Sequence, residues 1–260
     1  MEVVILSSAD EIAAVGADVI VALLTRKPDG VVGLATGSSP LGVYRRLIER
    51  HQAGEVSFAA ARAFLLDEYV GLAAEHPQRY RSVIGEVFEQ YVDFAPGAVR
   101  GPDGNALDLP DACARYEAAI AQAGGVDVQL LGIGTDGHVA FNEPGSSLTS
   151  RTRVKTLTSQ TRADNARFFP SPAEVPRHVL TQGLGTISDA RHLLLIAGGA
   201  GKAAAVQVMV EGPVSAFCPA SVLQLHQHAT VLLDEDAAAS LTLGDYYRET
   251  HANKPAWQRL

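Results

Sequence analysis

The sequence predicts an α/β fold of the doubly wound type, in which helices cover both faces of a mainly parallel, Rossmann-like sheet. Short apolar segments rich in leucine or β-branched residues recur along the chain, largely without alternation of apolar and polar residues. Such segments are typical of strands buried on both faces of a parallel sheet. Longer segments with helical patterns lie between them, and this alternation favours a doubly wound domain. The predicted strands are Val3–Leu6, Val31–Ala35, Ala63–Leu66, Val126–Leu131, His192–Ala197 and Thr230–Leu233.

Residues typical of helix N-termini support the prediction of helices between the strands. Ser8 is followed three residues later by Glu11, which is the pattern of a capping box. Ser39 and Pro40 match the N-cap and first position of a second helix. Residues 145–181 lack a clean strand pattern, and we expect a mobile segment over a site there. The predicted helices lie near Asp10–Thr25, Pro40–Gln52, Asp111–Gln122 and Lys202–Val210.

Composition restricts the class of protein. The chain has 260 residues without a break in composition, so we expect one domain over residues 1–260. A net charge of −8 argues against a nucleic-acid or anionic-membrane partner, although a small anionic substrate needs only a few local cations. The two cysteines form no CxxC pattern, which favours a reducing cytoplasm over a disulfide framework. Neither a signal peptide nor an apolar stretch of membrane-spanning length is present, so we expect a cytoplasmic protein.

The turn after the second predicted strand is a candidate phosphate site. In an open parallel sheet, ligands bind beyond the carboxyl ends of the strands. Here the turn contains Thr36, Gly37, Ser38 and Ser39 and leads into a helix. Backbone N–H groups and the helix dipole favour an anion at that position. The alternative is an ordinary capped turn, and the spacing matches neither common nucleotide-binding motif.

Two acidic residues follow the third predicted strand. Asp67 and Glu68 come directly after an apolar segment, where a carboxylate can act as a general base at the floor of a pocket. The alternative is a solvated turn in which Asp67 caps the following segment. This motif alone does not decide between them.

The glycine-rich exit from the fourth predicted strand is the most informative segment. Asp136 and Glu143 flank His138, whose side chain titrates near neutral pH. A carboxylate beside an imidazole fixes its tautomer and favours its charged form. The sequence therefore predicts a proton-transfer site on this loop.

Two further groups are weaker candidates. The turn 198–202 is rich in glycine and places Lys202 at a helix start, which suits either a second anion site or an exposed lysine. His226 and His228 could bind a metal, but no acidic or cysteine partner accompanies them. We therefore expect no metal and interpret this pair as a polar strand entry.

The combination of DEYVGL with DGHVAFNEP resembles the glucosamine-6-phosphate deaminase (glucosamine-6-phosphate isomerase) family. The resemblance runs in the family's order over nearly the whole chain. Ser38-Ser39 replaces a Gly-Thr pair of the family, and a hydroxyl is kept at position 39. The matching segments are LATGSSP at 34–40, LLDEYVGL at 65–72, EHPQRY at 75–80, GIGTDGHVAFNEPGSSL at 132–148, SRTRVKTLT at 150–158 and SVLQLH at 221–226.

The resemblance implies a three-layer α/β/α fold and a reaction. Glucosamine 6-phosphate and water would give fructose 6-phosphate and ammonium, in the catabolism of N-acetylglucosamine and other amino sugars. No metal and no organic cofactor are implied. Asp67 would move a proton between C2 and C1, and His138 would assist ring opening with support from Asp136 and Glu143.

The resemblance also implies how the substrate phosphate is held. The loop Thr36–Ser39 would bind it together with Lys202 and Arg167. Arg167 matches the family's substrate-binding arginine on a mobile lid, which we place within residues 157–181. Such a lid closes on the substrate and excludes water.

Some members of the family are hexamers activated by N-acetylglucosamine 6-phosphate at subunit interfaces. An Arg–Lys pair with hydroxyl groups suits a phosphate. The alternative is that this segment only supports the lid in a non-allosteric member. The residues that match the effector site are Ser146, Arg153, Lys155, Thr156 and Tyr246.

Other functions stay open at this point. One alternative is a 6-phosphogluconolactonase, in which we do not expect DEYVG or AFNEP. Another is an isomerase or deaminase of a different sugar phosphate. A sugar-phosphate sensor would usually carry a helix-turn-helix module, for which we see no room before the first predicted strand.

Overall fold

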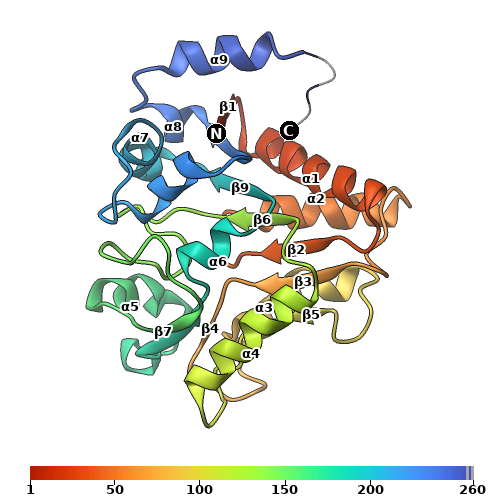
Figure 1. The fold of residues 1–260 in the computed structure, drawn as a ribbon, viewed down its shortest axis with the longest axis vertical. Helices are drawn as coiled ribbons and strands as arrows, with labels where there is room; N and C mark the ends of the chain where they lie inside the picture. The colour runs from red at the N-terminus through yellow and green to blue at the C-terminus, as the bar shows by residue number, and fades with distance from the viewer. Residues whose placement is uncertain (256–257, 259–260) are drawn as a thin grey trace.

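The computed structural model describes residues 1–255 and 258. A seven-stranded sheet forms its centre, in the order β1-β10-β9-β6-β2-β3-β5 (Figure 1). All neighbouring strands in it are parallel. The predicted strands are confirmed, each within two residues of its expected ends. The strands are β1 (Glu2–Leu6), β2 (Val31–Leu34), β3 (Arg62–Leu65), β5 (Val99–Arg100), β6 (Val128–Leu131), β9 (His192–Ala197) and β10 (Ala229–Asp234).

Helices flank this sheet to give the three-layer α/β/α fold. Tyr44 stacks on Phe88 with ring centres 4.8 Å apart, and Tyr116 meets Phe64 edge-on at 5.8 Å. The side chains of these four residues are almost fully buried, so they attach helices to the core. The α-helices are α1 (Ala9–Arg26), α2 (Leu41–Gln52), α3 (Tyr80–Val87), α4 (Leu109–Gln122), α5 (Ser159–Asn165), α6 (Leu184–Ser188), α7 (Ala203–Glu211), α8 (Glu235–Ala238) and α9 (Gly244–Ala252). Short 3-10 helices are η1 (Glu89–Tyr91), η2 (Ala166–Phe168), η3 (Pro172–Glu174), η4 (Ala200–Lys202) and η5 (Pro219–Leu225).

One of the two predicted helix starts is confirmed and the other is wrong. Ser8 is the N-cap of α1 and accepts the backbone N–H of Glu11. Ser39 is not the N-cap of α2, which begins at Leu41 and has Pro40 as its N-cap without a side-chain hydrogen bond. The reason is that residues 38–41 first form a turn, closed by a 3.4 Å hydrogen bond from Leu41 to the carbonyl of Ser38.

A second, three-stranded antiparallel sheet was not predicted. It has the order β4-β8-β7 and is made of β4 (Asp67–Tyr69), β8 (His178–Thr181) and β7 (Arg153–Thr156). The alternative of a solvated turn after β3 is wrong, because the acidic segment is a strand. Residues 145–181, which lack a clean strand pattern, contain the two strands β7 and β8. These short segments are partly polar and pair with partners far away in sequence, so no local pattern marks them.

The strand order fixes where a ligand can bind. From β2 the chain proceeds to β3 and β5 on one side, and β6 then returns to the other side of β2. The point at which the order reverses lies between β2 and β6, and parallel sheets bind ligands in the crevice at this point. The exits of β9, β6, β2 and β3 lie consecutively there. Among the described residues, no helix combines the length and hydropathy of a membrane span.

Candidate active site

Asp67 and Glu68 follow β3 directly, and their carboxylates lie in different environments. Glu68 is fully buried. Its carboxylate accepts backbone hydrogen bonds from Tyr69, Tyr80 and Arg81 at 2.9, 2.9 and 3.0 Å. Tyr80 and Arg81 form the start of α3, so Glu68 satisfies two N–H groups of its first turn. Glu68 is therefore explained by the fold.

Asp67 has no comparable structural explanation. Its side chain is 5% exposed, and among the described residues none donates a hydrogen bond to its carboxylate. Burial, and secondarily the neighbouring Glu68 carboxylate, raise the pKa of Asp67 to about 8. The interpretation of Asp67 as the cap of a solvated turn is wrong, since the residue is a buried part of β4. A buried carboxylate without partners, titrating near neutral pH, is suited to act as a general base.

The loop after β6 places His138 beside Asp136. Nδ1 of His138 lies 2.6 Å from Oδ1 of Asp136, close but poorly aligned for a hydrogen bond. The same carboxylate oxygen accepts the backbone N–H of His138 at 3.1 Å. The His138 side chain is 31% exposed, so a ligand can reach it. Contact with Asp136 at one ring nitrogen orients the imidazole and leaves the other nitrogen for proton transfer.

Glycines determine the shape of this loop. A Cβ atom at Gly134 would lie 2.2 Å from Nδ1 of His138, so the imidazole packs directly on the glycine backbone. Gly137 has φ of +81°, and its Cβ would lie 2.6 Å from Sγ of Cys218. Both positions therefore exclude any larger residue.

Glu143 contacts the expected lid. Its Oε1 accepts hydrogen bonds from the hydroxyl groups of Thr158, at 3.1 Å, and Thr161. Thr158 is the N-cap of α5 and accepts the backbone N–H of Thr161. The hydrogen bonds of Glu143 thus join the loop after β6 to the start of α5. These two threonine partners could not be predicted, because a hydroxyl near a carboxylate is recognisable only after folding.

The two acidic loops are held next to each other by β8. Thr181 pairs with Asp67 in the ladder between β8 and β4, and its hydroxyl accepts the backbone N–H of Phe141 at 3.2 Å. The side-chain amide of Asn142 donates to the carbonyl of Gln182 at 2.8 Å. The segment that contains His138 is therefore anchored to the strand that pairs with Asp67.

The two candidate anion loops open onto one groove. Ser38 and Ser39 line it from the exit of β2, and Gly198 lines it from the exit of β9, in a volume of about 880 Å³. Gly132 also lies close, because a Cβ there would be 3.4 Å from Oγ of Ser39. This arrangement places small and hydroxyl-bearing residues around the start of α2, which suits an anion.

The remaining predicted phosphate residues do not line this groove. Thr36 and Gly37 belong to the loop before α2, and Gly37 has φ of +93°. Lys202 ends η4, immediately before α7. Arg167 lies on η2 and is exposed, with its guanidinium carbon 4.7 Å from the ring centre of Phe168.

Comparison with known proteins adds to this geometry. The sequence model described as glucosamine-6-phosphate isomerases/6-phosphogluconolactonase matches residues 7–232. The chain belongs to this family. Within it, the chain is 66% identical to the glucosamine-6-phosphate deaminase of Mycolicibacterium smegmatis and 64% identical to that of an Arthrobacter species, over the full length of both partners in each case.

Solved structures of the family agree with the fold. The structure of a monomeric glucosamine-6-phosphate deaminase has a TM-score of 0.90 at 44% identity, covering 92% of this chain and all of the other. A 6-phosphogluconolactonase from Trypanosoma brucei has a TM-score of 0.72 at 22% identity, covering 93% of this chain and 98% of the other. The lactonase comparison supports the shared family fold alone.

Five residues match the family's effector site, and four of them lie within residues 146–156. Ser146 is buried, and its hydroxyl has no hydrogen-bond partner within the described residues. Arg153 and Lys155 are partly exposed on β7, where burial lowers the pKa of the Arg153 guanidinium, and Thr156 ends the strand. Tyr246 is 59% exposed on α9, which lies at the other end of the molecule from β7 (Figure 1).

The histidine pair near β10 has a structural explanation. The ring nitrogens of His226 lie 2.8 Å from the carbonyl oxygens of His228 and Ala190. The His228 ring stacks on His192 with centres 3.6 Å apart. Within residues 1–255 and 258, no cluster of three or more His, Cys, Asp or Glu side chains is placed to hold a metal ion.

Proposed function

We propose that this protein converts glucosamine 6-phosphate and water to fructose 6-phosphate and ammonium. Relatives that are 56–66% identical are glucosamine-6-phosphate deaminases, whereas six 6-phosphogluconolactonase structures with this fold are 15–23% identical. Within the molecule, the observation that carries the proposal is the buried, unpartnered carboxylate of Asp67 beside the His138 loop. An aldose–ketose shift needs one carboxylate at C1–C2 and a separate acid or base at the ring oxygen.

In this proposal the two acidic loops divide the reaction. His138, oriented by Asp136, takes the proton from the C1 hydroxyl and gives it to the ring oxygen as the C1–O5 bond breaks, which opens the pyranose to the aldehyde. Asp67 then removes the proton from C2 and delivers it to C1, through an enolamine intermediate. Ammonia leaves from C2 as water adds, which gives the ketose. Glu143 is assigned a supporting role for His138, and its hydrogen bonds to Thr158 and Thr161 tie their shared loop to the lid.

The phosphate is assigned to the groove at the start of α2. Thr36, Gly37, Ser38 and Ser39 provide N–H and hydroxyl donors there, with Lys202 and Arg167 as the cations. The lid is assigned to the part of residues 157–181 before β8, because β8 is the middle strand of its sheet. The whole chain is assigned to one cytoplasmic domain over residues 1–260.

The substrate assignment is tested with a panel of phosphorylated sugars. Ammonia release is measured with glucosamine 6-phosphate, with N-acetylglucosamine 6-phosphate and with glucosamine. Hydrolysis of 6-phosphogluconolactone is measured in parallel. We expect rapid turnover of glucosamine 6-phosphate alone, and lactone hydrolysis without ammonia release would replace this proposal by the lactonase function.

The contact between Glu143 and the lid gives a separate prediction. Thr161→Val removes a hydroxyl that bonds the Glu143 carboxylate, so the closed lid should lose stability. We expect KM for glucosamine 6-phosphate to rise about 5-fold, since a hydrogen bond to a charged group contributes on the order of 1 kcal/mol or more. Ser171→Ala is the matched control, because Ser171 bonds the exposed Glu174 in the same segment. Equal KM values for both variants would argue against a lid held by Glu143.

An effector site is proposed around β7. Ser146, Arg153, Lys155 and Thr156 would bind the phosphate of N-acetylglucosamine 6-phosphate, and Tyr246 would come from a second copy, since α9 lies far from β7. We expect sigmoidal saturation that becomes hyperbolic with this effector, and an oligomer in solution. Hyperbolic curves unaffected by the effector, from a monomer, would leave β7 with only a supporting role for the lid.

A further inference from the structure

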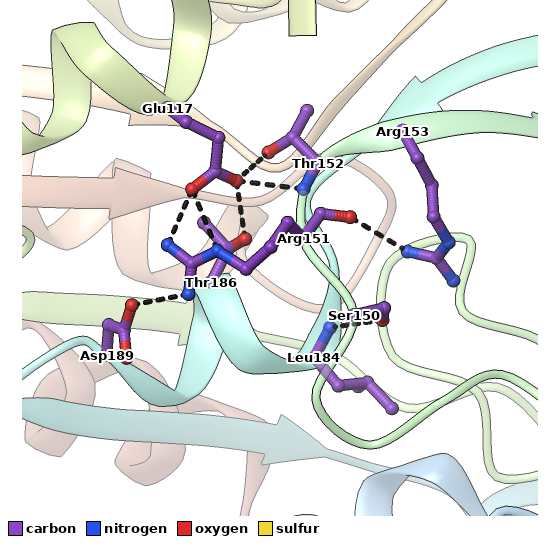
Figure 2. A network of polar contacts seen from close by, with 8 residues as sticks. All are labelled: Glu117, Ser150, Arg151, Thr152, Arg153, Leu184, Thr186 and Asp189. Carbon is purple, nitrogen blue, oxygen red and sulfur yellow. Dashed lines mark hydrogen bonds and ion pairs between the residues drawn. The ribbon is translucent and has the colours of Figure 1, made fainter. Parts of the chain in front are cut away.

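The Glu117 carboxylate on α4 joins two segments that lie far apart in sequence (Figure 2). It accepts the backbone N–H of Thr152 at 2.8 Å, and the hydroxyls of Thr152 and Thr186 also donate to it. The guanidinium of Arg151 donates two more hydrogen bonds, at 3.1 and 2.6 Å. The Glu117 side chain is only 20% exposed. If an amide replaced this carboxylate, one of its two acceptor oxygens would be lost, and several of these donors would lose a charged hydrogen-bond acceptor.

The segments joined by Glu117 pack backbone against backbone. Gly185 donates its N–H to the carbonyl of Ser150 at 2.9 Å, and Leu184 donates to the Ser150 hydroxyl at 3.1 Å. A Cβ at Gly183 would lie 2.1 Å from the Ser150 carbonyl oxygen. Nothing larger than glycine fits between the two segments, so their separation is fixed as long as the cluster around Glu117 is intact.

This cluster sits at the base of the hairpin formed by β7 and β8. Thr152 precedes β7 directly, and Thr186 follows β8 by a short turn and the start of α6. In the three-stranded sheet, Arg153 pairs with Thr181, and Thr181 pairs with Asp67. The residues next to the Glu117 cluster are therefore in register with the proposed general base, and the lid lies at the far end of the same hairpin.

Asp67 depends on this register for its position. No hydrogen bond from the described residues holds its carboxylate, so the backbone ladder to β8 sets its location. We propose that Glu117 is a positioning residue for Asp67, which it fixes by clamping the base of the β7–β8 hairpin. This inference rests on the proposed function of Asp67 as general base.

The test compares Glu117→Gln with Asp127→Asn. Asp127 is a matched control, since it is 6% exposed and accepts from Val31, Lys27 and Arg191 at the opposite end of the sheet. Both variants should lower the melting temperature. Glu117→Gln should also lower kcat about 10-fold with a small change in KM, because small misplacements of a catalytic group are costly.

The pH profile separates positioning from stability. Loosening the sheet admits water to Asp67 and lowers its pKa, so the ascending limb of kcat/KM should move about one pH unit lower in Glu117→Gln. Asp127→Asn should keep the parent's limb. The same limb and kcat in both variants would overturn the inference, whereas an inactive parent would instead refute the proposed function.

A milder variant covers the case in which Glu117→Gln does not fold. Thr186→Val removes one hydroxyl donor to Glu117 and retains the carboxylate and its other contacts. We expect a shift of the ascending limb in the same direction and of smaller size. A soluble Thr186→Val protein with the parent's pH profile and kcat would equally overturn the role of Glu117.

Discussion

Asp67→Asn is expected to lower kcat by about 10³-fold, within the range found for removal of a general base. The amide has nearly the same size, so substrate binding and KM should change little. Only the group that carries the proton between C2 and C1 is lost. Steady-state ammonia release measures the effect, and an unchanged rate in this variant would contradict the assignment of Asp67.

The same substitution should stabilise the protein as the pH rises. The pKa of Asp67 is about 8 in the folded chain, against 3.8 as its ordinary value. The parent therefore loses free energy of unfolding between about pH 4 and pH 8, because the unfolded chain releases this proton first. Asp67→Asn lacks this loss, so its advantage should grow through that window to about 6 kcal/mol and stay constant above it.

Urea unfolding at several pH values measures this difference. The control is Asp127→Asn, which removes a buried carboxylate that already has three partners and should destabilise the chain. A constant difference between Asp67→Asn and the parent from pH 4 to pH 8 would mean that Asp67 is not held in an unfavourable environment. Gain of stability with loss of activity is typical of a residue kept for function.

His138→Gln is the second large effect, and we expect kcat to fall about 10²-fold. Ring opening then proceeds without its acid, whereas Asp67 still acts at C1–C2. The pH profile of the parent should have an ascending limb that belongs to Asp67, whose pKa is about 8. This limb should remain in His138→Gln, because Asp67 is unchanged. Equal kcat values in the two proteins across the pH range would remove His138 from the mechanism.

Asp136→Asn should show an intermediate loss. Asp136 contacts the imidazole at Nδ1 and its own loop backbone, so the amide keeps the loop and weakens the orientation of the ring. A decrease larger than that of His138→Gln would indicate that Asp136 contacts the substrate directly.

The central sheet could be predicted from the sequence because its strands are apolar and buried on both faces. The apolar runs that become β2 and β9 are buried throughout, so burial alone identifies them. The strand β7 could not be found in this way. Its sequence RVKT is polar and half-exposed, and only pairing with β8 makes it a strand. Tertiary contacts of this kind leave no local signal.

The candidate site, like the strands, could be predicted only in part from the sequence. Asp67 and His138 could be named as candidates because they follow apolar strands at the end where parallel sheets bind ligands, and the family resemblance then implied their roles. The partners of Glu143 and the cluster around Glu117 were missed, since threonine hydroxyls and surface-like helix residues carry no signal before folding. Glu117 lies in a helix whose pattern indicates an ordinary solvated face, and its contacts come from residues 34 to 69 positions away.

The most direct test of the account is the stoichiometry of one reaction. Purified protein is incubated with glucosamine 6-phosphate, and ammonium and fructose 6-phosphate are measured in parallel, with Asp67→Asn beside the parent. We expect equal amounts of both products from the parent and almost none from Asp67→Asn. Fructose 6-phosphate without ammonium, no product from the parent, or equal rates in the two proteins would contradict a deaminase that works through Asp67.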